Sequence, residues 1–412
     1  MASQDSSEAE VLIHGGGMVG LTLGVALAGA GVETVVLDKA DPATTVVAEY
    51  DGRVSAITHG SQQALSAIGV WRDIAPHAEP ILEIRVTDGD SPLFLHFDHR
   101  AVGDAPFGHI VENRHTRQAL YAAAARLDRL QLIAPCGLRE LKRGPVRIEA
   151  ELDDGRRIRA RLAVAADGRH SSLRESAGIA VTTWRYDQIG IVCTVAHERP
   201  HRGVAQERFL AAGPFAILPM TSDPTRGHRS SLVWTERADL APAIMALDEA
   251  GFAEEMANRF GDYLGRLEVV GGRWSFPLGL SHATRYADQR LVLIGDAAHA
   301  MHPISGQGLN LGLRDVAALA ELVVDARRLG LDIGAGDILD RYERWRRFDT
   351  ALLLAVTDGL NRLFSNDIAP IKLIRDLGLA AVNQIPPLKR FFMRNAMGTI
   401  GDLPRLVRGE PL

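Results

Sequence analysis

The feature that most constrains the fold is a glycine-rich turn between a short apolar strand and a helix near the N-terminus. Residues 10–14 (EVLIH) form an apolar run of strand length, a GxGxxG pattern follows, and LTLGVALAGAG is typical of a helix. The next apolar run, ETVVLD, ends at Asp38. A strand, a Gly-rich turn, a helix and a second strand of these lengths predict a βαβ unit that binds a dinucleotide.

Each glycine of the pattern has a physical role in such a unit. Gly15 permits the tight turn, Gly17 lets the main chain approach a pyrophosphate, and Gly20 lets helix and strand pack closely. The N–H groups at the start of the helix, where Met18 and Val19 stand, then face the phosphates with a partial positive charge. The alternative is a turn whose glycines serve packing alone.

Asp38 is an acidic residue at the end of the second strand, where it can accept hydrogen bonds from a ribose. Its negative charge disfavours a 2′-phosphate, so the site favours FAD or NAD over NADP. The choice between these two depends on the rest of the chain.

A second stretch rich in small residues, LIGDAAHAMHPISGQGLNLG (residues 293–312), follows another apolar strand. A planar ring that lies against the main chain needs such residues. Asp296 is a candidate for bonding ribityl or pyrophosphate-side groups, and Gly306, Gln307 and Gly308 offer N–H groups to the edge of a flavin. The helix predicted from Leu309 onward would direct its positive end there. A hydride-transferring dehydrogenase would not explain this loop, which favours FAD.

Three stretches together resemble the group A flavoprotein monooxygenases, the para-hydroxybenzoate hydroxylase-like family: the GxGxxG turn, AADGRHSSLR (residues 165–174) and LIGDAAHAMHPISGQGLNLGLRD. The resemblance covers residues 10–350. Within the family the chain most resembles the ubiquinone-biosynthesis hydroxylases that act on polyprenylated phenols. That likeness is carried by EYDGRVSAI, VENRHTRQAL, PISGQGLNLGLRD, YERWRRFD and TDGLNRLFSND.

The resemblance assigns roles that spacing alone does not. It implies that Arg53 and Arg114 contact the FAD, that Asp167 and Asp296 belong to cofactor-binding motifs, and that Pro303 borders the flavin ring. The flavin-proximal residues are then Pro303, Gly306 and Gln307. The expected cofactor-binding residues are Gly15, Gly17, Met18, Val19, Gly20, Asp38, Arg53, Arg114, Asp167, Asp296, Gly306, Gln307, Gly308, Leu309 and Asn310.

Two positions depart from the family pattern. His14 stands directly before the glycines, where a small or β-branched apolar residue is usual, and Asp38 replaces the more usual Glu. Neither change removes a hydrogen-bonding group that the cofactor needs. We expect His14 to be a partly buried histidine with a partner.

The resemblance also implies the reaction. FAD is reduced, with NAD(P)H as the expected reductant, reacts with O2 to a C4a-hydroperoxide, and the oxygen attacks an electron-rich phenol ring. A polyprenyl phenol is the expected substrate, and GPFAILPM (residues 213–220) is a candidate apolar wall for it or an ordinary core strand. No second dinucleotide fold is visible for NAD(P)H, no metal is required, and the sequence identifies no catalytic base.

Two other functions stay open. One is the same hydroxylation of a small soluble aromatic compound. The other is a flavin-bearing member of a biosynthetic complex whose role is mainly structural, although a scaffold would not need the small residues of the second loop. Contact with other proteins of ubiquinone biosynthesis is likewise left open.

The elements predict an α/β chain: a Rossmann-like FAD-binding domain with an inserted β-rich substrate domain and a helical C-terminal tail. We expect a discontinuous FAD-binding domain (1–75, 100–180 and 276–350), a substrate domain (76–99 and 181–275) and a helical region (351–412). Finer expectations are a loop at EYDGRVSAITHGS, a helix at 61–70, a hairpin at Asp153–Gly155 and one helical insert at 242–264.

Composition excludes several other classes. A net charge of -5 over 412 residues gives no basic footprint for nucleic acid. Cys136 and Cys193 lie far apart and form no CxxC pair, which argues against a disulfide framework or a zinc site. His299 and His302 are spaced like metal ligands but lack an obvious third ligand, so we expect no metal.

The expected location is the cytoplasm. Residues 1–9 are polar and do not resemble a signal peptide, and the sequence has no apolar run of about 18 residues. From Asp349 onward, apolar patches mix with basic residues such as Lys372, Lys389, Arg390 and Arg394. This pattern fits a packed helical tail and leaves a peripheral contact with the inner membrane open.

Overall fold

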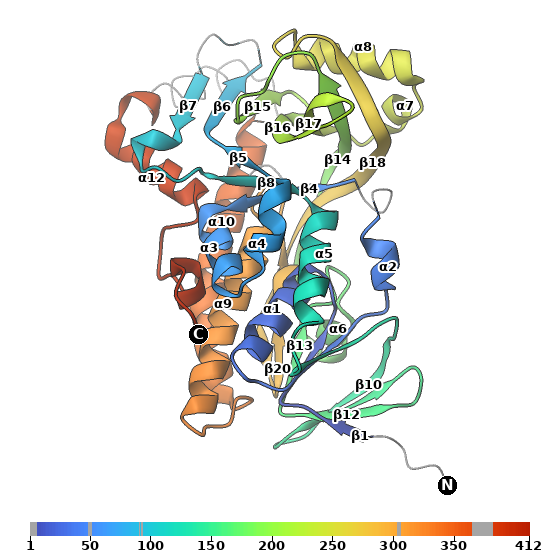
Figure 1. Ribbon diagram of the computed structural model, residues 1–412, viewed down its shortest axis with the longest axis vertical. Helices are drawn as coiled ribbons and strands as arrows, with labels where there is room; N and C mark the ends of the chain where they lie inside the picture. Colours follow the sequence, from blue (N-terminus) through green and yellow to red (C-terminus); the bar gives the residue numbers. More distant parts are fainter. Residues whose placement is uncertain (1–5, 48–51, 90, 92–93, 303–305, 365–381) are drawn as a thin grey trace.

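The computed structural model describes residues 6–47, 52–89, 91, 94–302, 306–364 and 382–412. Two large sheets dominate it, one mainly parallel and covered by helices, the other mainly antiparallel, and Figure 1 shows them at opposite ends of the molecule. The expected α/β class is confirmed. The domain boundaries given above remain a prediction.

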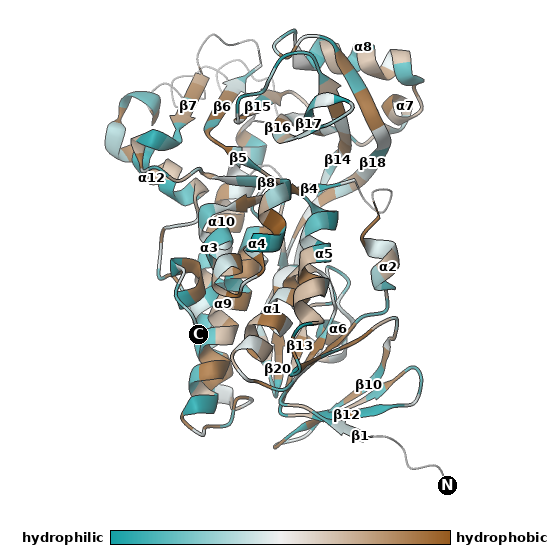
Figure 2. Ribbon diagram, in the orientation of Figure 1, coloured by the Kyte–Doolittle hydropathy of each residue, from teal (hydrophilic) through white to brown (hydrophobic). Residues whose placement is uncertain are grey.

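The first sheet has six strands in the order β19-β20-β13-β2-β3-β9. Its pairs are parallel except for the edge pair β19–β20. The four inner strands are buried on both faces, which explains why they read as mainly apolar runs, whereas the edge strands include polar residues. Their bounds are β2 (Val11–His14), β3 (Thr34–Leu37), β9 (Leu130–Ile133), β13 (Leu162–Ala165), β19 (Ala287–Asp288) and β20 (Leu291–Leu293). Figure 2 shows β13 and β20 in the hydrophobic colour.

Helices cover this sheet, and the first of them starts after the Gly-rich turn that follows β2. α1 (Met18–Gly29) is apolar all round and buried between α5 (Asn113–Ala124) and α9 (Gly308–Arg328). α9 is buried over most of its length and also packs against α10 (Gly336–Phe364). The main hydrophobic core lies between these helices and the parallel strands.

The second sheet has eight strands in the order β21-β18-β14-β17-β16-β15-β6-β7. Two of them, β14 and β18, are 17 residues long each, and Figure 1 shows β18 extending down toward the parallel sheet. α7 (Ala241–Met245) and α8 (Glu249–Phe260) cover the outer face. The strand bounds are β6 (Glu83–Asp88), β7 (Phe94–Asp98), β14 (Val181–His197), β15 (Val204–Leu210), β16 (Gly213–Asp223), β17 (Gly227–Arg237), β18 (Leu267–Ala283) and β21 (His299–Ala300).

Two smaller sheets complete the described chain. One joins β4 (Val54–Thr58), β8 (Gly108–Glu112) and β5 (Ala78–Ile81). The other has the order β1-β12-β11-β10 and contains the expected hairpin, in which Gly155 takes a φ of 88°. Its strands are β1 (Ser6–Glu8), β10 (Leu138–Arg143), β11 (Ile148–Leu152) and β12 (Arg157–Ala160).

Three local expectations need correction. Val54–Thr58, inside the expected loop, is strand β4, because it pairs with β8 more than 50 residues away, as local sequence cannot show. The next helix, α3 (His59–Ala67), starts two residues earlier than expected, since the Thr58 side chain caps it. The helical insert near 242–264 is two helices, because Asp248 caps a new one.

The C-terminal region is helical only in part. α10 is followed, beyond residues 365–381, by α12 (Pro386–Ala396) and then by the short turn η5 (Arg405–Arg408). Residues 365–381, including Lys372, lie outside the described residues. No helix within the described ranges is long and apolar enough to cross a membrane.

Candidate functional site

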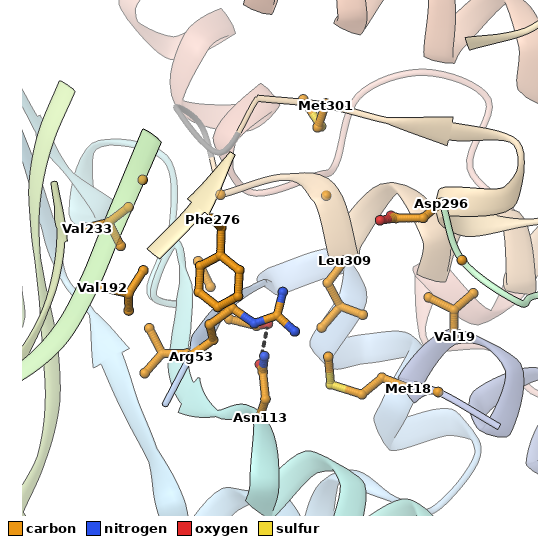
Figure 3. Close-up of a pocket in the computed structure, with 18 of the residues that line it drawn as sticks. Met18, Val19, Arg53, Asn113, Val192, Val233, Phe276, Asp296, Met301 and Leu309 are labelled. Carbon is orange, nitrogen blue, oxygen red and sulfur yellow. Dashed lines mark hydrogen bonds between the residues drawn. The ribbon is translucent and has the colours of Figure 1, made fainter. Parts of the chain in front are cut away.

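A cavity of about 890 Å³ lies between the parallel sheet and the inner face of the eight-stranded sheet. Figure 3 shows its two sides: Met18, Val19 and Asp296 on one, Val192 and Phe276 on the other. Its lining comes from segments spread over almost 300 positions of the chain, from Gly16 to Leu309. A pocket of this size is typical of a small-molecule or cofactor site.

The three glycines of the first turn differ in what surrounds them. Gly15 has a φ of 114°, and a Cβ there would lie 2.2 Å from the carbonyl oxygen of Ala166. A Cβ at Gly20 would lie 1.9 Å from the carbonyl oxygen of Gly15. Gly17, by contrast, lines the cavity and has no atom within 4 Å of its Cβ position. Gly15 and Gly20 are therefore needed for packing, and Gly17 leaves open space for a ligand.

Asp38 also lines the cavity and fixes the turn beside it. Its Oδ2 accepts a hydrogen bond from Gly16 N at 2.6 Å, and its Oδ1 accepts one from Ala40 N at 2.8 Å. An ionised carboxylate has about four acceptor positions, so capacity remains for a ligand hydroxyl.

Asp296 lies on the turn where β20 ends, on the short helix η3 (Gly295–Ala297). Gly295 has a φ of 57°, and a Cβ there would touch the Val19 side chain at 3.3 Å. The turn is thus packed against the start of α1, which brings Asp296, Met18 and Val19 to one side of the cavity (Figure 3). Asp296 is exposed and lines the cavity.

The second small-residue loop reaches the cavity through Gly306, Gly308 and Leu309. Gly306 has a φ of 60°, and α9 begins at Gly308 with no side-chain cap, so N–H groups at its N-terminus remain available. Gln307 is the N-cap residue and does not line the cavity. Pro303 lies outside the described residues.

Asn310 acts behind the cavity wall. Its Nδ2 donates to the carbonyl oxygens of Ala56, at 2.7 Å, and Gly306, at 3.1 Å, and its Oδ1 accepts from Thr58 N at 3.0 Å. Asn310 therefore joins β4 to the loop, and it is not among the residues that line the cavity.

The two expected arginines differ. Arg53 lines the cavity, and its guanidinium lies 5.0 Å from the centre of the Phe276 ring (Figure 3). Arg114 does not line the cavity but pairs with Glu112 at 3.1 Å. Burial would raise the pKa of Glu112, but hydrogen bonds from His115 and Arg114 hold this pKa at about 2. In the described structure, Arg114 is thus committed to an internal ion pair.

Sequence reasoning missed the residues of α5 that do face the cavity: Asn113, Arg117 and Tyr121. They are spaced four apart and so share one helix face, whereas Arg114 is turned about 100° away. The helix period read along VENRHTRQALY would have found this face.

Of the two residues Asp167 and Gly168, only Gly168 lines the cavity, and Asp167 stabilises the segment that follows. Gly168 and Arg169 line the cavity, while Asp167 Oδ2 accepts from Ser172 N at 2.8 Å and so holds the start of α6 (Ser172–Ser176). His14 Nδ1 lies 3.3 Å from the same oxygen. The expected partner for His14 is therefore Asp167, which links the first strand to the AADG segment.

His299 and His302 have separate surroundings. His299 Nε2 lies 2.6 Å from Asp315 Oδ2, and the His302 ring packs edge-on against Tyr186. Burial lowers the pKa of His302 to about 4. In the described ranges no group of three or more His, Cys, Asp or Glu side chains is arranged to hold a metal ion.

The inner face of the eight-stranded sheet forms an apolar wall. Within GPFAILPM, alternate residues Pro214, Ala216 and Leu218 line the cavity, while Phe215 and Ile217 face the core under α7 and α8. The segment is thus both a cavity wall and a core strand.

Comparisons with known proteins agree on one family. A model described as FAD binding domain matches residues 8–352. "Ubiquinone hydroxylase UbiL" of Rhodospirillum rubrum is 54% identical over 98% of this chain and 94% of its own length. "3-demethoxyubiquinol 3-hydroxylase" of Escherichia coli is 34% identical over 94% and 98%. "Ubiquinone biosynthesis monooxygenase COQ6, mitochondrial" of Homo sapiens is 32% identical over 93% and 91%.

Solved structures share the fold at lower identity. p-Nitrophenol 4-monooxygenase PnpA from Pseudomonas putida superposes with a TM-score of 0.79 at 20% identity, covering 95% of this chain and 98% of its own. PqsL from Pseudomonas aeruginosa, described as a probable FAD-dependent monooxygenase, reaches 0.74 at 22% over 91% and 100%.

Proposed function

The chain belongs to the FAD-binding-domain family and is an FAD-dependent monooxygenase, and from this premise we propose that it hydroxylates the aromatic ring of a polyprenylated phenol in ubiquinone biosynthesis. The observation that carries the substrate class is the 54% identity, over nearly the whole chain, to a protein named ubiquinone hydroxylase. The apolar wall of Pro214, Ala216 and Leu218 supports it, because a prenylated ring needs an apolar surface.

The residues around the cavity fit FAD. We assign the pyrophosphate to the start of α1, because the open space at Gly17 lets a phosphate approach the N–H groups there. We assign a ribose to Asp38, whose carboxylate keeps acceptor capacity, and the ring end of FAD to the side lined by Asp296, Gly306 and Gly308.

FAD supplies the redox and oxygen-activating chemistry when bound, with NAD(P)H as the reductant we expect. The chain itself has to bind, orient and exclude water. The N-terminus of α9 stabilises negative charge that develops beside Gly308. The apolar sheet face keeps water away from the reacting ring.

Contact with a membrane surface is a finer part of the proposal. α12 carries Phe391 and Phe392, which are 52% and 37% exposed, next to Lys389 and Arg390. A helix with exposed aromatic rings and basic residues suits the interface of an anionic bilayer, where a polyprenyl substrate resides. Co-sedimentation with phosphatidylglycerol vesicles, compared with phosphatidylcholine vesicles, tests this; equal lack of binding to both would contradict it.

The experiment that tests the function is mass spectrometry of quinone lipids from cells that lack the gene. We expect an under-hydroxylated polyprenyl phenol to accumulate while ubiquinone is lost, and the mass and fragmentation of that phenol identify the ring position. If the wild-type gene restores ubiquinone and the Asp296→Ala variant does not, the loss of ubiquinone depends on the cavity. Unchanged ubiquinone, with purified enzyme that hydroxylates a small phenol instead, would contradict the proposal.

A further inference from the structure

Glu207 occupies a singular place on the apolar wall of the cavity. Glu207 on β15 is paired with Ala216 on β16. Ala216 is paired with Val233 on β17, and Val233 with Val192 on β14, so the four residues form one row across the sheet. All four residues line the cavity. Among the described residues that line the cavity from the eight-stranded sheet, Glu207 is the one with an ionisable side chain.

No hydrogen bond or ion pair joins the Glu207 carboxyl to another side chain in the described part of the protein. On its two neighbouring strands it is aligned with Val86 and Ala216, which offer no polar group. The other polar residues of this sheet that line the cavity are Gln206 and Thr235. The other charged groups of the cavity, Asp38, Lys39, Arg53, Arg117, Arg169 and Asp296, come from elements outside this sheet.

The surroundings of Glu207 disfavour its charge. Burial alone raises the pKa of its carboxyl to about 8, and no neighbouring charge contributes to the shift. The Glu207 side chain is half-buried and lines the cavity, so a ligand that fills the cavity would complete its burial. A polar group that is buried without a hydrogen-bond partner costs free energy. A carboxyl that reaches the cavity from an apolar wall without a partner therefore indicates a ligand that supplies one.

We propose that Glu207 hydrogen-bonds the phenolic hydroxyl of the aromatic substrate and accepts its proton. This inference rests on the proposed function and names the base for that same reaction. The O–H bond of the phenol breaks, its electron pair stays on the oxygen as phenolate, and a new O–H bond forms on the carboxylate. The proton returns when the hydroxylated product is released as a neutral phenol, so none is consumed.

The pKa of Glu207 suits this transfer. A phenol has a pKa of about 10, so a glutamate with the ordinary pKa of 4.5 lies more than five units away. The raised pKa of about 8 brings the two groups to about two units apart. Proton transfer between groups with similar pKa values, near the working pH, is the most effective general base catalysis.

A binding experiment tests the contact without turnover. The FAD-loaded enzyme is titrated with 2-prenylphenol and with its methyl ether, which lacks the proton, and binding is followed by flavin fluorescence. We expect the wild type to prefer the phenol by about tenfold or more. Glu207→Leu should lose this preference, whereas Glu149→Gln, an exposed control on β11, should keep it. An equal preference in wild type and Glu207→Leu would overturn the inference, as would a wild type that binds neither probe.

Kinetics test the proton transfer. For the wild type, kcat/KM should rise with pH, reach half its plateau near pH 8, the pKa of Glu207, and level off above that pH. Glu207→Gln keeps the shape of the side chain and should lower kcat/KM by about 10²–10⁴ at unchanged flavin content and without any loss of thermal stability. Formate should partly rescue Glu207→Ala. Equal kcat/KM and pH profiles in wild type and Glu207→Gln would overturn the role as base.

The two proposals can fail separately. A wild type that binds the phenol with the stated preference but hydroxylates no polyprenyl phenol contradicts the proposed function and leaves the Glu207 contact in place. If Glu207→Gln and Glu207→Leu hydroxylate the polyprenyl phenol as well as the wild type does, the inference alone is contradicted.

Discussion

His299 Nε2 lies 2.6 Å from Asp315 Oδ2, and both side chains are almost completely shielded from solvent. The same carboxylate accepts hydrogen bonds from Gly295 N at 3.0 Å and from Arg346 Nε at 2.8 Å. Asp315 on α9 thus joins the turn after β20, the short strand β21 and helix α10. The turn that presents Asp296 to the cavity is held by this buried charged network.

Asp315→Asn should destabilise the fold and weaken FAD retention together. Burial would raise the pKa of Asp315, but His299 and Arg346 lower it, so the group is an anion with two cationic or donor partners. Loss of its charge leaves Arg346 buried with less compensation, which typically costs about 3–5 kcal/mol. Urea denaturation and the flavin-to-protein ratio measure the two effects. Asp340→Asn on the exposed face of α10 is the control, and equal stability of both variants would contradict the role of the network.

Asp296→Ala should weaken FAD retention and activity while the stability of the fold is unchanged, in contrast to Asp315→Asn. Asp296 is exposed on η3 and makes no hydrogen bond or ion pair within the described residues, so we expect a stability change within about 0.5 kcal/mol. Its loss removes a polar group from the cofactor side of the cavity. Equilibrium dialysis of FAD and thermal unfolding of the apoprotein check this. Full flavin occupancy with normal turnover would contradict our interpretation of the second loop.

Parts of the site that depend on local chain geometry could be predicted from sequence. The Gly-rich turn, Asp38 and the start of α9 were predicted from short sequence patterns, in which one or two residue types are enough to identify the turn or the helix start. Their places along the cavity agree with those patterns, because turns and helix starts are decided by the backbone of a few adjacent residues.

Parts that depend on pairing between distant segments could not be predicted. Strand β4 forms only because β8 pairs with it, and Glu207 reaches the cavity only because β15 lies between β6 and β16. The sequence around Glu207, VAQERFL, places three consecutive polar residues between two apolar pairs, so it has no alternation that would assign Glu207 to one face of the strand. Which face of that strand meets a cavity is decided by the tertiary structure.

Gly15→Ala and Gly17→Ala should separate folding from cofactor binding within one turn. Gly15 has a φ of 114°, so an alanine there stores about 1–3 kcal/mol of backbone strain and also meets the Ala166 carbonyl. Gly17 has a φ of -68° and open space at its Cβ position, so an alanine there fits the fold. Its methyl group would, however, occupy the space that we assign to the pyrophosphate. We expect Gly15→Ala to lower the melting temperature of the apoprotein.

For Gly17→Ala we expect an unchanged melting temperature of the apoprotein and an FAD affinity lowered by about tenfold or more, which corresponds to about 1.4 kcal/mol. Fluorescence titration of the apoprotein with FAD measures the affinity. If Gly17→Ala binds FAD as tightly as the wild type, the assignment of the pyrophosphate to the start of α1 is wrong.

The stability of Glu207→Gln relative to the wild type should depend on pH. The Glu207 carboxyl has an ordinary pKa of 4.5 in the unfolded chain and about 8 in the folded protein. Below pH 4.5 both states are protonated, and above pH 8 both are ionised. Between these values the unfolded chain binds fewer protons than the folded protein, so the wild type loses stability as pH rises. Gln does not titrate.

Glu207→Gln should therefore gain stability over the wild type steadily from pH 4.5 to pH 8, with no further gain above pH 8. Urea denaturation of both proteins at several pH values gives the difference in unfolding free energy. The matched variant Glu149→Gln, at an exposed position, should show no such gain over this range, because its side chain is in solvent in the folded protein as well. A difference between Glu207→Gln and wild type that stays constant from pH 4.5 to pH 8 would show that the Glu207 carboxyl ionises normally in the folded protein.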